Sequence, residues 1–114
     1  MSLVLKNEKY EDTVFALKKF ILDFPNSVYQ ANANYWIGQI YYQSSNFKKA
    51  KYFFNLVFRK YPNSNKAAIS MLKMANILDK TGNKKEAKKI YKKILYSYPK
   101  LEEAKQAKKK LSFL

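Results

Sequence analysis

The chain has 114 residues, 47% of them hydrophobic, with only two glycines and three prolines, which predicts one folded, helix-rich domain and excludes a disordered tail. It contains no cysteine and no histidine, so thiol chemistry, the usual zinc sites and the usual general base at neutral pH are excluded. The net charge is +15, and 22 of the 23 basic residues are lysine. Arginine is better suited than lysine to phosphate recognition, so this bias is interpreted first as the codon usage of an AT-rich genome.

The first predicted element is a helix at residues 8–24, preceded by residues 1–7, which we expect to be a leader. Its side chains Thr13, Leu17 and Phe20 are spaced four and three apart and therefore share one helix face. Pro25 ends this helix, because the residue before a proline is pushed out of the α region.

Two helix pairs and a final helix follow, and the proline motif that closes each pair recurs every 37 residues. Residues 31–64 form the first repeat, residues 68–101 the second, and residues 102–112 the terminal helix. The column of Thr13, Leu17 and Phe20 recurs, which predicts the same buried face on the second helix of each pair. The repeated columns are Ala50, Phe54 and Val57, then Ala87, Tyr91 and Ile94.

Small residues occupy a fixed place on the first helix of each pair, namely Gly38 and Ala75. We expect them to let the partner helix come close. Together with the closing prolines, this pattern resembles the tetratricopeptide (TPR) repeat, which is about 34 residues long. The resemblance implies an all-α fold, a right-handed superhelix of antiparallel helix pairs with about six helices.

A more specific resemblance is carried by "FPNSVYQANANYWIGQIYY", "YPNSNKAAISMLKMANIL", "GNKKEAKKIYKKILYSYP" and "EEAKQAKKKL". These stretches look like the C-terminal TPR domain of the periplasmic Tol-Pal accessory protein, the YbgF/CpoB family. The resemblance implies a periplasmic scaffold that binds TolA, with a septal peptidoglycan synthase as a second partner. Such a scaffold links septal peptidoglycan synthesis to outer-membrane constriction in cell division. Family members trimerise through an N-terminal coiled coil that this sequence lacks, so we expect the domain alone to be monomeric. A weaker resemblance is to the TPR lipoprotein of outer-membrane β-barrel assembly.

Stacked helix pairs of this kind usually bind partners on the concave side, which the first helices line. At 100° per residue, the side chains of each first helix that do not face a neighbouring helix face the concave side, and this gives one set from each of the two repeats. Amides and tyrosines there can hydrogen-bond a peptide and offer rigid contact area. The expected partner-binding residues are Asn32, Tyr35, Gln39, Tyr42, Gln43, Leu72, Asn76 and Asp79.

Two other side chains of the first pair are expected inside. Trp36 should face the preceding helix, since an aromatic side chain at helical spacing is usually part of the core. Asn34 should be buried and hydrogen-bonded to backbone, with the turn at residues 25–27 as the nearest source of free groups.

The stretch "NKKEAKKIYKKIL" places lysines between apolar residues of 3–4 spacing, which predicts the solvated outer face of an amphipathic helix. The alternative for this face is contact with an acidic partner or an anionic membrane. The charge of residues 59–114 leaves a basic nucleic-acid-binding domain as the alternative function. Carboxylates are scattered and no nucleophile has a base at a recognisable spacing, so we expect no enzyme, no cofactor, no metal and no membrane insertion.

Overall fold

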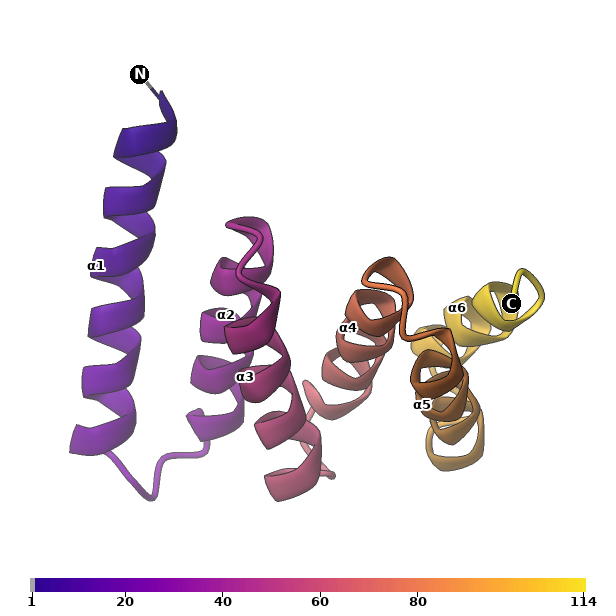
Figure 1. Cartoon of the computed structure of the whole chain (residues 1–114). Helices are drawn as coiled ribbons and strands as arrows, with labels where there is room; N and C mark the ends of the chain where they lie inside the picture. The colour runs from indigo at the N-terminus through magenta and orange to yellow at the C-terminus, as the bar shows by residue number, and fades with distance from the viewer. Residues whose placement is uncertain (1) are drawn as a thin grey trace.

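The computed structural model describes residues 2–114, with side-chain environments from Lys9 onward. It is all-α, and its six helices follow one another side by side, so that the two termini lie at opposite ends of the array (Figure 1). The helices are α1 (Ser2–Asp23), α2 (Gln30–Gln43), α3 (Phe47–Lys60), α4 (Ala67–Lys80), α5 (Lys84–Ser97) and α6 (Glu102–Leu111). Helices α2 and α3 form one antiparallel pair and α4 and α5 the next, which confirms the predicted fold class.

Helix α1 is longer than the helix expected at residues 8–24. It begins at Ser2, so residues expected to be a leader continue its backbone. Within the described chain no helix packs before α1, and Thr13 is therefore exposed, whereas its counterparts Ala50 and Ala87 are fully buried.

The turn inside each pair uses a residue with positive φ. Ser45 has a φ of 62° and Gly82, 37 residues later, a φ of 91°. The residue after each one closes the helix end, because Asn46 N–H donates to the Tyr41 carbonyl at 2.8 Å and Asn83 N–H repeats the bond. Glycine adopts this left-handed backbone freely and serine does not, so the second turn is the less strained of the two.

Gly38 marks the closest approach of α2 to α3. A Cβ atom added there would lie 2.9 Å from Cε1 of Phe54, a ring that is fully buried. The expected role of this small residue is confirmed, and Ala75 at the same place in the next pair is also fully buried.

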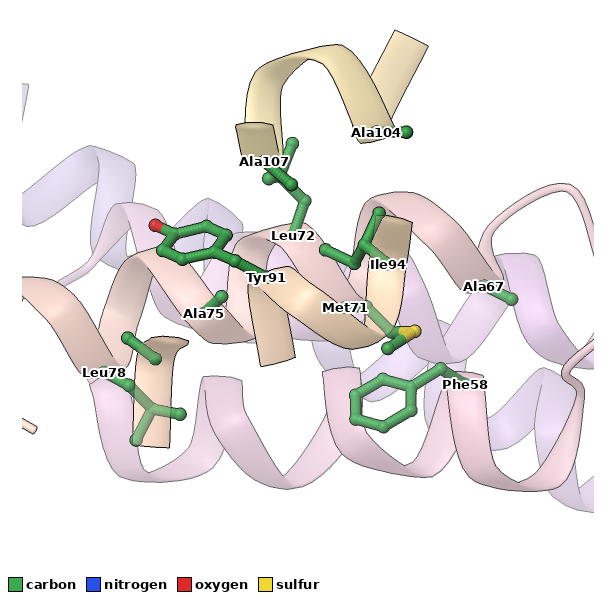
Figure 2. Packing of buried hydrophobic residues seen from close by; sticks show 11 residues of the cluster. Phe58, Ala67, Met71, Leu72, Ala75, Leu78, Tyr91, Ile94, Ala104 and Ala107 are labelled. Carbon is green, nitrogen blue, oxygen red and sulfur yellow. The ribbon is translucent and has the colours of Figure 1, made fainter. Parts of the chain in front are cut away.

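The hydrophobic core runs along the array as two clusters. One joins α2 and α3 to Ile77 of α4, and the other joins Phe58 of α3 to α4, α5 and α6. Figure 2 shows the second cluster, in which Tyr91 and Ile94 of α5 lie between α4 and α6. Every residue of the predicted columns on α3 and α5 is fully buried, which confirms the 37-residue periodicity as the origin of the core.

A hydrogen bond also links adjacent repeats outside the core. Tyr98, at the carboxyl end of α5, donates its hydroxyl proton to the Pro62 carbonyl at 2.6 Å. Pro62 belongs to the turn between α3 and α4, so this bond fixes the second pair against the end of the first.

Among residues 2–114, no helix combines the length and apolar character that crossing a bilayer requires.

Candidate partner-binding groove

The first helices of successive pairs, α2, α4 and α6, contribute side chains to one open cavity of about 510 Å³. We call the surface from Asn32 on α2 through Asn76 on α4 to Lys110 on α6 the groove. Within the groove, the cavity is lined by Tyr42, Asn76, Asp79, Lys80, Lys84 and Lys110.

Most of the residues expected at the partner surface are accessible, and three of them, Tyr42, Asn76 and Asp79, meet at the cavity. Gln43 is exposed and the others are half-buried. The accessible members of the expected set are Asn32, Gln39, Tyr42, Gln43, Asn76 and Asp79.

Tyr35 and Leu72 are placed differently, and the expectation that they face the groove is wrong. Tyr35 is 7% exposed and packs its ring 5.7 Å from that of Phe54. Leu72 is 2% exposed and packs in the cluster that includes Ala104 and Ala107 of α6. Small residues on the following first helix let it come close enough to cover Leu72, which the phase of a single helix does not reveal.

Trp36 was expected inside, but it is 47% exposed. Its ring meets the Tyr35 ring edge-on at 5.1 Å, and Nζ of Lys66 lies 5.3 Å from the Trp36 ring centroid. Ala33 and Ile40 share a face of α2 with Trp36, and Ala33 is buried whereas Ile40 is half-buried, so that face is covered only in part. Trp36 is four residues after Asn32 and three before Gln39, so it lies beside them on α2, at the edge of the groove.

Asn34 is buried and donates from Nδ2 to a backbone carbonyl, as expected, but the acceptor is Gln30 of its own helix at 2.9 Å. The bond to the preceding helix end comes from Gln30, which sequence analysis missed. Its Nε2 donates to the carbonyls of Ile21 and Phe24 at 3.1 and 2.7 Å. Gln30 is thus a buried amide that satisfies the carboxyl end of α1.

Polar contacts hold the side chains of Asn76 and Asp79 at the cavity. The Tyr91 hydroxyl donates to Oδ1 of Asn76 at 2.5 Å, and Nζ of Lys84 lies 2.6 Å from Oδ1 of Asp79. The Oε1 atom of Gln39, nearby on α2, is buried and accepts no hydrogen bond from any described residue.

The lysines of the cavity are the functional candidates that sequence analysis did not select. Lys80 follows Asn76 by four residues and so lies on the same helix face, a signal that was available. Lys110 and Lys84 come from other helices and no local pattern links them to it. The described residues include no group of three or more acidic side chains placed to hold a metal ion.

A family model described as "Tetratricopeptide repeat" matches residues 32–64 and 70–101, more than half of the chain. The chain belongs to the tetratricopeptide repeat family. It is therefore a TPR protein-interaction module, a scaffold of a kind that is typically non-catalytic.

This TPR chain is also similar to the cell division coordinator CpoB of Escherichia coli strain K12. The two are 40% identical over 42 residues, which is 37% of this chain and 16% of that protein. The matched part is thus a small fraction of CpoB, and it supports the resemblance to the YbgF/CpoB family over that part alone.

Proposed function

We propose that this TPR domain holds a segment of TolA in the groove and has no catalytic role. The observation that carries the proposal is the meeting of Tyr42 of α2 and Asn76 of α4, two successive first helices, at one open cavity. Amides such as that of Asn76 can donate to and accept from a peptide backbone. Tyr42 adds rigid contact area at low entropic cost.

The choice of TolA is supported by the partial similarity to CpoB and by the stretch at residues 32–39. On the same support we propose a periplasmic location and a role that links septal peptidoglycan synthesis to outer-membrane constriction. A septal peptidoglycan synthase is the second partner in this proposal. The proposal also treats the isolated domain as a monomer.

Replacement of Tyr42 by alanine is expected to weaken TolA binding about tenfold, as a central aromatic contact does in other interfaces. The measurement is isothermal titration calorimetry of the chain with the TolA periplasmic region. Tyr42 also packs 5.7 Å from Phe47, so a thermal melt should accompany the titration to show that Tyr42→Ala is folded.

The matched control is Tyr52→Ala, because Tyr52 is an exposed tyrosine on α3, outside the groove. This variant should bind TolA as the native chain does. Absence of TolA binding by the native chain would refute the partner, and equal effects of the two variants would refute the groove as its site.

A further inference from the structure

The cavity of the groove carries an excess of positive charge. Lys80, Lys84 and Lys110 line it, whereas Asp79 is the single carboxylate among the lining residues. Lys84 and Asp79 form an ion pair at 2.6 Å and offset each other. Neither Lys80 nor Lys110 has a carboxylate within ion-pair distance among the described residues. The cavity is therefore positively charged and open to solvent.

A fourth lysine strengthens this field. The Nζ atoms of Lys73 and Lys80 lie 5.4 and 5.5 Å from the centroid of the Tyr42 ring, so the electron-rich ring holds both ammonium groups beside the cavity. The carboxyl ends of α2, α4 and α6 lie at this cavity, because Tyr42, Lys80 and Lys110 are among the last two residues of their helices, and they contribute roughly half a negative charge each. Four lysines against one carboxylate outweigh them.

Asn76 presents a hydrogen-bond donor to the cavity. Its Oδ1 accepts from the Tyr91 hydroxyl, which leaves the Nδ2 amide protons as the groups that can donate to a ligand. Burial above all, then the Asp79 carboxylate and Tyr42, raises the pKa of Tyr91 to about 12. The hydroxyl therefore keeps its proton at neutral pH and holds the Asn76 amide in this orientation.

We propose that the cavity binds carboxylates of an acidic segment in the protein partner, with Lys80, Lys110 and Nδ2 of Asn76 as the donors. The inference rests on the proposed function, because it assigns a chemistry to the same groove. Ammonium and amide donors around one cavity match carboxylate oxygens, which accept only.

A protein segment fits better than a nucleic acid. Two ammonium groups lie over the Tyr42 ring, where a base would stack in a single-strand binding site. The cavity also lacks arginine, whose planar fork suits phosphate best.

The test is a nuclear magnetic resonance titration of the labelled chain with a blocked peptide of alternating Glu and Ala, and with its Gln and Ala counterpart. The Glu peptide should shift the amides of Tyr42, Asn76 and Lys80, and its affinity should fall with added salt. Lys80→Gln should weaken binding about fivefold, the upper range for an exposed charge pair. Tyr91→Phe should weaken it as well without any change of charge, since it frees the Asn76 amide to rotate.

Lys92→Gln is the matched control, because Lys92 is an exposed lysine on α5, outside the groove, and should leave affinity unchanged. Equal shifts from the Glu and Gln peptides would overturn the inference, and so would equal affinities of the Lys80→Gln and Lys92→Gln variants. Tighter binding of single-stranded DNA at the same amides would also overturn it. If TolA shifts groove amides and the Glu peptide does not, only the acidic segment is refuted; if the Glu peptide binds and TolA does not, only TolA is refuted.

Discussion

Replacement of Gly38 by valine is expected to lower the free energy of unfolding by about 1–3 kcal/mol, the usual cost of overpacking a core. The added Cβ would lie 2.9 and 3.0 Å from Cε1 and Cδ1 of Phe54. The Phe54 ring has no exposed surface, so it cannot swing into solvent to make room. The two helices of the first pair must separate instead, and urea denaturation monitored by circular dichroism measures the loss.

The cause can be isolated by a second change. Phe54→Leu removes the ring edge, so the double variant should lose less stability than the two single changes added together. Gln43→Val is the control in the same helix, since Gln43 is exposed, and should be close to neutral. Native-like stability of Gly38→Val would show that the helices do not meet as closely as described.

Replacement of Trp36 by alanine is expected to weaken TolA binding by roughly thirtyfold, or about 2 kcal/mol, the range of an aromatic hot spot. The ring is 47% exposed at the groove edge, and it is held by the Tyr35 ring and by Lys66. Its orientation is thus fixed before a partner arrives, which lowers the entropic cost of contact. Calorimetry with the TolA periplasmic region measures the loss.

Tyr96→Ala serves as the comparison for Trp36→Ala, because Tyr96 is a 90% exposed aromatic residue on α5. It should bind TolA with native affinity. If Trp36→Ala binds equally well, the exposed ring is ordinary surface and the partner does not reach that edge.

The core was predictable from sequence because it depends on spacing along single helices. Ala50, Phe54 and Val57 share a face by their intervals alone, and the same intervals recur in α5. Proline and turn residues set the helix ends for local reasons, so the pairs could be counted in advance.

The placement of Leu72, Trp36 and Gln30 could not be read in this way. Each depends on how far apart two helices lie, which is set by side chains from another repeat. Leu72 is covered because Ala104 and Ala107 of α6 are small, whereas Trp36 stays exposed on a face of α2 that is covered only in part. Gln30 finds its acceptors only because α1 ends against the start of α2.

The groove residues were likewise predictable from sequence only in part. Tyr42, Asn76 and Asp79 were selected by helical phase and do meet at one cavity. Lys110 was not selected, because it reaches that cavity from a helix whose sequence reads as a uniform lysine-rich surface. Periodicity identifies the face of a helix, but a site shared by three helices appears only when they are packed.

The surface that binds the partner is located most directly by amide chemical-shift mapping of the labelled chain during titration with the TolA periplasmic region. If the groove holds the partner, the largest shifts will fall on Asn32, Gln39, Tyr42 and Asn76, while Tyr52 on α3 and Lys92 on α5 stay near their free positions. Shifts confined to the outer faces of α3 and α5, with the groove residues unmoved, would contradict the assignment of the groove as the binding surface.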